Sequence, residues 1–455
     1  MRIRVALLVA VACAGCAPKQ VEPRRPEHWG VDRTAEIRDA LDAGQARNVI
    51  LFIGDGMDHE TITMARNYQM GAAGRLNLDL LPFTGDITTY AVSETDPTLP
   101  DYVPDSASTA TAWATGVKTS DRRISTSAKT DMPIETIVEL AQRAGLRTGS
   151  ATTSDLTDAT PAALAAHVNY RKCGGPSEMD KCPQYSKSEG GLGSISEQMV
   201  DHKVDVLLGG GRKTFAQRID GGEHIGHSVI ESAVMQGYRV VYDAAQMNAV
   251  VSLNDGPVLG LLADEHFTTR WSGEWAKPYP CSGPQACKTD QRPPEQPSLA
   301  AMTEKALALL ENDKGFLLQV EGALIDKSAH DAAACQQIGE MIDFDEAIGV
   351  GMRWAARHPD TLLIVTADHA QGAQVVDWMD EVDHTLGLCS LLTTPEGSEL
   401  KVVYASNLQG QLQQHTGSQV RIAAIGPRAA NVLGLGDQTD VFFLMASALG
   451  LIDSP

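Results

Sequence analysis

Apolar runs with the length of a strand alternate along the chain with segments of helical periodicity. The first run, residues 48–53, is continuous and rich in β-branched residues, which is typical of a strand buried on both faces of a parallel sheet. Further strands are predicted at 147–152, 204–208, 316–320, 361–366 and 420–425. Helices are predicted at 133–144, 299–311, 337–356 and 437–449, and another is predicted to end at 167–171. This alternation predicts an α/β fold: a three-layer sandwich with a central mostly parallel sheet, helices on both faces, and surface insertions.

The first sixteen residues have the layout of a secretory signal. Arg2 and Arg4 precede an apolar run at 5–12, and small residues follow at 14–16. The run is too short to span a bilayer as a permanent helix. Ala-Gly-Cys at 14–16 also resembles the end of a bacterial lipobox, which would make Cys16 a lipidated first residue; simple cleavage and an uncleaved anchor are the alternatives. We expect an exported protein of the periplasm or cell envelope, lipid-anchored if Cys16 is modified.

The remainder of the chain is predicted to consist of a spacer followed by one large domain. Residues 17–46 are rich in Pro, Glu and Arg and are interpreted as a spacer with a short helix. Residues 47–455 are interpreted as a single catalytic domain. Its periodicity weakens near 264–297 and 371–418, where we expect insertions.

The chain of 455 residues carries a formal net charge of -21. This acidic balance, without a basic stripe, argues against a nucleic acid as partner. A small anionic substrate remains compatible with it, because metal ions and an arginine can reverse the potential inside one cleft.

Six of the eight cysteines lie beyond Cys16, and export would permit them to form disulfides. Cys173 and Cys182 bracket a Gly-Gly-Pro loop and are predicted to form a local bridge. Cys335 is predicted to pair with Cys281 or Cys287, and the pairing of Cys389 stays open. Among these six cysteines no Cys-x-x-Cys pair occurs, so a structural zinc knuckle is not expected.

Potential metal ligands follow three of the apolar runs directly. Asp55 lies between two glycines after the first run, Glu321 follows 316–320, and Asp368 with His369 follows 361–366. Each motif alone has an ordinary explanation, such as a turn aspartate. The carboxyl ends of parallel strands share one edge of a sheet, however, and this edge is where open α/β sheets bind ligands. Carboxylates gathered there would repel one another unless cations were present.

Two further segments could bring reactive groups to the same edge. Asp326 and His330 are four residues apart and would lie on one face of a helix, where both can reach one zinc ion; alone, such a pair is more often a solvated surface pair. Ser106 stands near a predicted helix N-terminus within 104–116, where backbone N–H groups stabilise negative charge. A serine there is more often only a cap.

With these motifs in order, the chain resembles the bacterial alkaline phosphatase family, which uses two zinc ions, one magnesium ion and a serine nucleophile. The resemblance covers almost the whole chain beyond residue 48. It rests on Ile53-Gly-Asp-Gly-Met57, Pro104-Asp-Ser-Ala107, Asp158-Ala-Thr-Pro161, Val320-Glu-Gly322, Asp326-Lys-x-x-His330, Thr366-Ala-Asp-His369 and His415-Thr-Gly417.

The resemblance implies three metal sites and a phosphate clamp. Asp326, His330 and His415 would hold the first zinc ion. Asp55, Asp368 and His369 would hold the second, beside Ser106. Asp55, Thr160 and Glu321 would hold magnesium. Arg171 would clamp phosphate with Ser106 as nucleophile, while Lys327 and Asp158 would shape phosphate and magnesium affinity. Gln371 stands where a well-known bacterial member carries His; such an outer-shell change can alter zinc affinity, and its effect here stays open.

The function implied is hydrolysis of phosphate monoesters of broad range, with release of inorganic phosphate through a phosphoserine intermediate and a homodimeric assembly. The alternative is a phosphodiesterase or sulfatase of the same superfamily, against which Ser106 and Arg171 argue. A catalytically silent metal- or phosphate-binding lipoprotein is a rival from another class. His59 and His167 are expected to be ordinary surface or core histidines.

Overall fold

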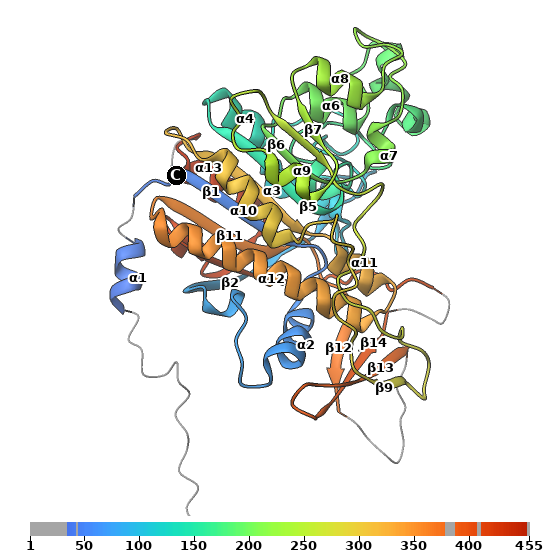
Figure 1. Cartoon of the computed structure of the whole chain (residues 1–455), viewed down its shortest axis with the longest axis vertical. Coiled ribbons are helices and arrows are strands. Elements are labelled where there is room, and N and C mark those ends of the chain that lie inside the picture. Colours follow the sequence, from blue (N-terminus) through green and yellow to red (C-terminus); the bar gives the residue numbers. More distant parts are fainter. Residues whose placement is uncertain (1–33, 42–43, 378–386, 407–410, 453–455) are drawn as a thin grey trace, which may run out of the picture.

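The computed structural model describes residues 34–41, 44–377, 387–406 and 411–452 (Figure 1). The predicted signal sequence, Cys16 and most of the spacer therefore lie outside the described residues. The first described element is helix α1 (Thr34–Leu41). Within the described ranges, no helix combines the length and the apolar character needed to cross a membrane.

A ten-stranded sheet forms the centre of the molecule, in the order β16–β2–β15–β11–β1–β10–β5–β6–β8–β7. Strand β1 (Asn48–Gly54) is buried at every residue and lies between β10 (Phe316–Gly322) and β11 (Thr361–Ala367), parallel to both. Its lack of polar alternation is the consequence of being covered on both faces. The predicted strand at 48–53 is therefore confirmed at the middle of the sheet.

The flanks of the sheet differ in direction. On one side β5 (Arg147–Asp155), β6 (Val206–Gly210), β8 (Val258–Leu261) and β7 (Arg239–Val241) are all parallel. On the other side β15 (Val420–Ile425) is antiparallel to β11 and to β2 (Phe83–Thr88), and β16 (Gly434–Asp437) is parallel to β2. The sheet is thus mostly parallel, as predicted.

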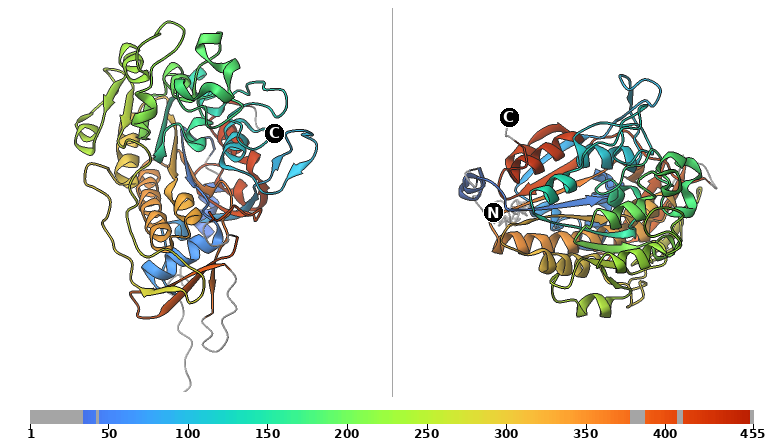
Figure 2. Two further views of the ribbon diagram at one scale, coloured as in Figure 1. Left: turned by 90° about the vertical axis from the view of Figure 1, so that its right-hand side faces the viewer. Right: turned by 90° about the horizontal axis from the view of Figure 1, so that it is seen from above.

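Helices cover both faces of this sheet (Figure 2). Helices α10 (Leu299–Leu310) and α12 (Ala334–Arg357) pack together on one face, while α3 (Ser106–Thr115) and α13 (Gln438–Ala448) pack together on the other. The remaining helices are α2 (His59–Met70), α4 (Ile137–Arg143), α5 (Ala159–Ala162), α6 (Ile195–Asp201), α7 (Arg212–Phe215), α8 (Val229–Met235), α9 (Ala244–Ala249) and α11 (Leu324–His330). The predicted three-layer sandwich is confirmed.

The helix predicted to end at 167–171 is wrong in extent, because α5 covers only Ala159–Ala162. The N–H groups of Leu164 and Ala165 bond to carbonyl groups three residues back, so the chain tightens into turns. Val168 then forms an antiparallel bridge with Ile124, which requires extended backbone. A tertiary contact therefore ends the helix before residue 167.

The two segments predicted as separate insertions meet in one small sheet (Figure 1). Strand β9 (Ser282–Gln285) comes from the first segment, and β12 (Ala373–Val376), β13 (Leu388–Thr393) and β14 (Glu399–Tyr404) come from the second. Their order is β12–β14–β13–β9, and a short two-stranded ribbon, β3 (Ala91–Val92) with β4 (Pro100–Asp101), lies elsewhere.

Three disulfides stabilise the described chain. The predicted Cys173–Cys182 bridge is confirmed. Cys287 pairs with Cys335 at the start of α12, which is one of the two predicted alternatives, and Cys281 pairs with Cys389 inside the small sheet. The small sheet is therefore covalently tied to a core helix.

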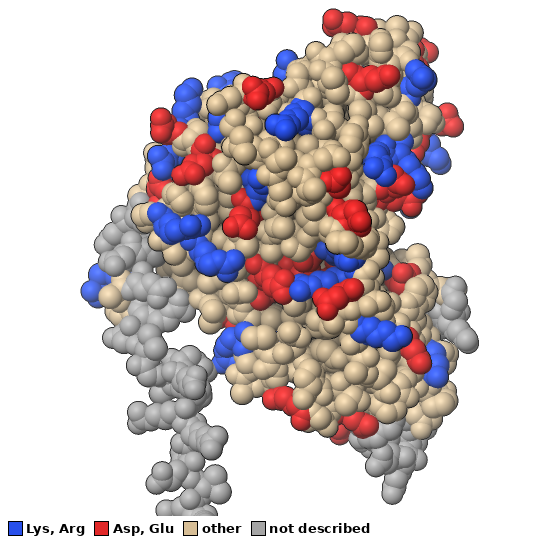
Figure 3. Space-filling model, in the orientation of Figure 1, with Lys and Arg blue, Asp and Glu red and all other residues tan. Residues whose placement is uncertain are grey.

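On the face shown in Figure 3, Lys and Arg side chains are interspersed with Asp and Glu side chains.

Candidate active site

The carboxyl ends of β1, β10 and β11 bring their polar residues to one edge of the sheet. The register pairs Ile53 with both Glu321 and Thr366, so the residues that follow each strand lie side by side. Asp55, Glu321 and Asp368 are at most 4 % exposed. The structure thus brings together the three carboxylates that the sequence places after separate apolar runs.

One group of potential ligands consists of Asp326, His330 and His415, whose donor atoms all lie within 4.8 Å of one another. His330 Nε2 is 3.2 Å from Asp326 Oδ2 and 3.1 Å from His415 Nε2. The Nδ1 atom of each imidazole meets a backbone carbonyl, that of Gln413 for His330 and that of Pro104, at 2.9 Å, for His415. If Nδ1 carries the proton, both Nε2 atoms present lone pairs to the same point, which suits a cation.

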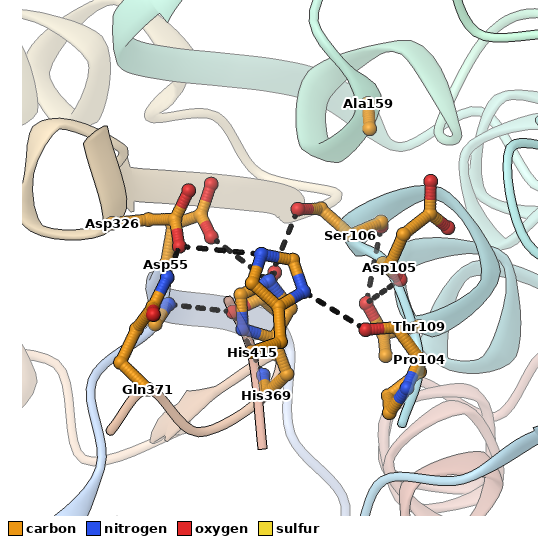
Figure 4. A network of polar contacts seen from close by, with 12 residues as sticks. Asp55, Pro104, Asp105, Ser106, Thr109, Ala159, Asp326, His369, Gln371 and His415 are labelled. Carbon is orange, nitrogen blue, oxygen red and sulfur yellow. Dashed lines mark hydrogen bonds and ion pairs between the residues drawn. The ribbon is translucent and has the colours of Figure 1, made fainter. Parts of the chain in front are cut away.

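A second group consists of Asp55, Asp368 and His369, all buried. His369 Nε2 is 3.1 Å from Asp368 Oδ2, 3.4 Å from Asp55 Oδ1 and 3.2 Å from Ser106 Oγ. The ring of His369 stacks on that of His415 with centroids 3.5 Å apart, so the two groups adjoin each other (Figure 4). A cation held by this group would lie beside the serine hydroxyl.

Electrostatics at this edge favour bound cations. Burial, reinforced by Asp368, Asp326 and Glu321, raises the pKa of Asp55 well above its usual range. Burial likewise raises the pKa of Glu321 to about 8 and that of Asp368 to about 6. Among the described residues, Asp55 Oδ1 and Asp368 Oδ2 accept no hydrogen bond. Buried carboxylate oxygens without donors are the ligands that divalent ions require.

Glu321 and Thr160 are, with Asp55, the residues of the predicted magnesium site. Glu321 Oε2 accepts a hydrogen bond of 2.5 Å from Thr152 Oγ1. Thr160 is buried in α5, where Asp158 caps the helix through the N–H of Ala159. An all-oxygen set of two carboxylates and a hydroxyl matches the preference of magnesium.

Ser106 is the first residue of α3, and its N-cap is Asp105. Asp105 Oδ1 accepts from the N–H groups of Ala107 and Ser108, at 3.1 and 3.0 Å. Ser106 itself lines a cavity of about 360 Å³ together with Arg171, Lys327, His330 and His415. Ser106 therefore lies at the wall of this cavity and at the positive end of a helix.

Two of the cations that line the same cavity, Arg171 and Lys327, are held by carboxylates. Arg171 donates from Nη1 to Asp105 Oδ2 at 3.1 Å and from Nη2 to Asp158 Oδ1 at 2.8 Å, and Lys327 Nζ lies 2.7 Å from Asp158 Oδ2. Burial opposes ionisation of Asp158, but Lys327 and Arg171 together hold its pKa well below the usual range. The guanidinium is thus fixed before any substrate arrives.

The prediction from sequence did not identify several residues of the site. Asp105 was named only as a member of the Pro104-Asp-Ser-Ala107 motif, and nothing in that motif reveals its bond to Arg171. Arg122, Tyr170 and Lys172 line the cavity from loops that carry no motif.

Gln371, which was named from the sequence, lies beside the group of Asp326, His330 and His415, because its Nε2 donates to Asp326 Oδ1. His59 forms a half-exposed pair with Asp86, at 2.8 Å, in keeping with an ordinary surface histidine.

Comparisons with known proteins agree with this arrangement. The family model described as alkaline phosphatase matches residues 46–412 and 396–451. The chain is 48% identical to an alkaline phosphatase of Escherichia coli over 432 residues, which cover 92% of this chain and 89% of that protein. It is 46% identical over 416 residues to a streptomycin-6-phosphate phosphatase of Streptomyces griseus, covering 89% of this chain and 91% of that one.

Among solved structures, the alkaline phosphatase of the Antarctic bacterium TAB5 has the same fold, with a TM-score of 0.69, 23% identity, and coverage of 90% of this chain and 100% of that one. The family match runs from before β1 to beyond α13, so it takes in every strand end and helix that the site uses. With close relatives aligned over about nine-tenths of its length, this chain belongs to the alkaline phosphatase family.

Proposed function

We propose that this protein hydrolyses phosphate monoesters of broad range through a phosphoserine intermediate on Ser106. The observation that carries the proposal is the position of the Ser106 hydroxyl. It lies at the start of α3, 3.2 Å from His369 Nε2, in the cavity that also exposes a fixed guanidinium from Arg171. Membership of a phosphatase family supports the same reaction.

The residues present fit two zinc ions and one magnesium ion. We assign one zinc ion to Asp326, His330 and His415, and the other to Asp55, Asp368 and His369, because mixed nitrogen and oxygen donors suit zinc. We assign magnesium to Asp55, Thr160 and Glu321. When bound, these ions would supply Lewis acidity and positive charge beside the serine and the leaving oxygen.

The side chains of this chain orient the phosphoryl group. The guanidinium of Arg171 can donate two parallel hydrogen bonds to phosphate oxygens, and Asp105 and Asp158 hold it in place for this. The N–H groups at the start of α3 add positive potential where negative charge develops. Lys327, which is bonded to Asp158, supplies a second cation at the cavity wall.

The chemistry then has two in-line displacements. Ser106 loses its proton and its Oγ bonds to phosphorus while the ester P–O bond breaks, and the departing alkoxide takes up a proton. Water then bonds to phosphorus while the Oγ–P bond breaks, so Ser106 regains a proton and inorganic phosphate is released. Two inversions give retention at phosphorus, and most of the catalysis comes from positioning and charge neutralisation.

The test compares hydrolysis of a phosphate monoester, a phosphate diester and a sulfate ester by the metal-loaded protein and by Ser106→Ala. We expect the monoester to be the fastest substrate and the variant to lose almost all activity. A faster diester or sulfate ester would overturn the substrate assignment. Full activity in Ser106→Ala would overturn the nucleophile.

The three disulfides and the similarity to bacterial alkaline phosphatases support export to an oxidising compartment. We propose a location in the periplasm or cell envelope, lipidation at Cys16, and a homodimer. Mass spectrometry of the mature N-terminus tests the lipid, and light scattering of the purified protein tests the dimer. An unmodified N-terminus beyond Cys16, or a monomer mass, would contradict these two proposals.

A further inference from the structure

A separate cluster of side chains that could hold a metal ion lies outside the site described above. It consists of Glu139 on α4, His167 in the turns after α5, and His202 at the end of α6, whose donor atoms all lie within 4.8 Å of one another. His167 Nε2 is 3.3 Å and His202 Nε2 is 3.8 Å from the same oxygen, Glu139 Oε1. Two imidazoles therefore face one carboxylate oxygen.

The outer nitrogen of each imidazole is already engaged. Nδ1 of His167 is 2.9 Å from the Ser125 carbonyl oxygen, and Nδ1 of His202 is 2.7 Å from the Ala165 carbonyl oxygen. A carbonyl can only accept, so Nδ1 of each ring is the donor and Nε2 is left with its lone pair in the neutral form. Metal-ligating histidines in proteins are held in this way, and His330 and His415 show the same arrangement.

The rest of the cluster is equally fixed. Glu139 Oε2 accepts from the Thr136 N–H at 2.7 Å in the capping box of α4, which leaves Oε1 turned toward the imidazoles. The main chain of His167 is clamped by Gln198 of α6, whose Oε1 accepts from the His167 N–H at 2.9 Å and whose Nε2 donates to the His167 carbonyl. The three donors are thus positioned without a ligand.

A pair of His167 with Glu139 alone would be an ordinary buried ion pair. It does not account for His202, whose Nε2 points to the same oxygen although a second imidazolium there would repel the first. A divalent cation satisfies both lone pairs and the carboxylate together. Donors that bind zinc at about 2.0–2.2 Å in a tetrahedron lie roughly 3.3 Å apart. The distance from Glu139 Oε1 to His167 Nε2 is 3.3 Å, and the distance to His202 Nε2, at 3.8 Å, is about 0.5 Å longer.

We propose that Glu139, His167 and His202 bind one zinc ion, with water in the fourth position. His167 is 4 % exposed, whereas the side chains of Glu139 and His202 are 26% and 29% exposed, so the ion enters from solvent. The site joins α4, α6 and the segment that leads four residues later to Arg171. Zinc there ties this segment to two helices.

The experiment titrates zinc chloride at pH 8 into full-length protein whose active-site metals have first been saturated, and it follows the heat of binding. His202→Asn is the test variant, because the Asn amide keeps a donor for the Ala165 carbonyl while Nε2 is removed. His227→Asn is the matched control, since His227 lies 3.8 Å from Glu231 in an exposed pair and, among the described residues, belongs to no group of three potential metal ligands.

We expect one additional zinc-binding event in the wild type and in His227→Asn, weakened at least tenfold in His202→Asn. Hydrolysis of a phosphate monoester is expected to stay within twofold of wild type in both variants, which separates this site from the active site. Absence of the additional event in the wild type, or an unchanged event in His202→Asn, would overturn the proposal. If His202→Asn fails to fold, Glu139→Gln is expected to show the same tenfold loss of zinc affinity. Unchanged zinc binding by Glu139→Gln would equally overturn the proposal.

Discussion

Asp105 uses its two carboxylate oxygens for different purposes, and substitution can separate them. Oδ1 caps α3 and also accepts from the Arg122 N–H at 3.0 Å, whereas Oδ2 holds Arg171. In Asp105→Asn, the amide oxygen can keep the cap. The amide nitrogen then faces the guanidinium, donor against donor, so the bond to Arg171 is lost. In Asp105→Ala both functions are lost.

The structure sets the size of each effect. A hydrogen bond to a charged group contributes about 1.5–3 kcal/mol, and Asp158 still holds the other guanidinium nitrogen, so we expect kcat/KM of Asp105→Asn to fall by about tenfold to a hundredfold. Loss of a cap costs about 0.5–2 kcal/mol. For a chain of 455 residues that cost corresponds to a fall of roughly 0.5–2 °C in the unfolding midpoint of Asp105→Ala.

The assay combines steady-state hydrolysis of p-nitrophenyl phosphate, inhibition by inorganic phosphate, and calorimetric unfolding of the two variants beside wild type. We expect both variants to bind phosphate more weakly, with only Asp105→Ala less stable. A kcat/KM for Asp105→Asn within twofold of wild type would refute the role of Asp105 in orienting Arg171. An equal loss of stability in both variants would refute the separation of the two oxygens.

Three other predictions concern the metal ions, a buried carboxyl group and a buried amide. Chelation is expected to abolish activity and lower the unfolding midpoint, with recovery by zinc plus magnesium; recovery with magnesium alone would contradict the two-zinc assignment. Burial raises the pKa of Asp58 to about 6, so the folded protein binds a proton that the unfolded chain releases, and stability is lost as pH rises. Relative to Asp58→Asn, the free energy of unfolding of wild type should fall by about 1.4 kcal/mol between pH 5 and 8, measured by denaturant titration. A difference in unfolding free energy between the two proteins that stays constant over this range would argue against this pKa. The side chain of Gln319 accepts from Trp113 Nε1 and donates to the Thr160 carbonyl, both at 3.0 Å, so Gln319→Leu leaves two buried groups unpaired. We expect this substitution to lower the free energy of unfolding by about 2–6 kcal/mol in the same titrations. A loss under about 1 kcal/mol would show that water replaces the amide.

The strand ends could be predicted from the sequence because their information is local. A continuous apolar run indicates a strand covered on both faces, and the polar residue directly after it must lie at the carboxyl edge, as Asp55, Glu321 and Asp368 do. Local sequence also placed Ser106 at a helix start, because the segment 104–116 begins with residues typical of a helix N-terminus. These positions depend on a few consecutive residues and on one general property of parallel sheets.

Other features depend on contacts between distant segments, and these contacts leave no recognisable pattern in the amino-acid sequence. The turns after α5 replace a predicted helix because Val168 bridges to Ile124. Strand β9 pairs with β13, so two weakly patterned segments form one sheet. The cluster of Glu139, His167 and His202 comes from three segments without a shared motif, and His167 therefore looked ordinary in the sequence.

The placement of β1 between β10 and β11 also determines when the protein can fold. Asn48 donates to Thr361, which lies 313 residues later, so the central strand has neither sheet neighbour until most of the chain has been synthesised. Pairing over such sequence separations is slow, since the loop must close before its contacts form. The nascent chain should therefore stay unfolded long enough to be exported as an extended polypeptide, and the enzyme should gain activity only after export.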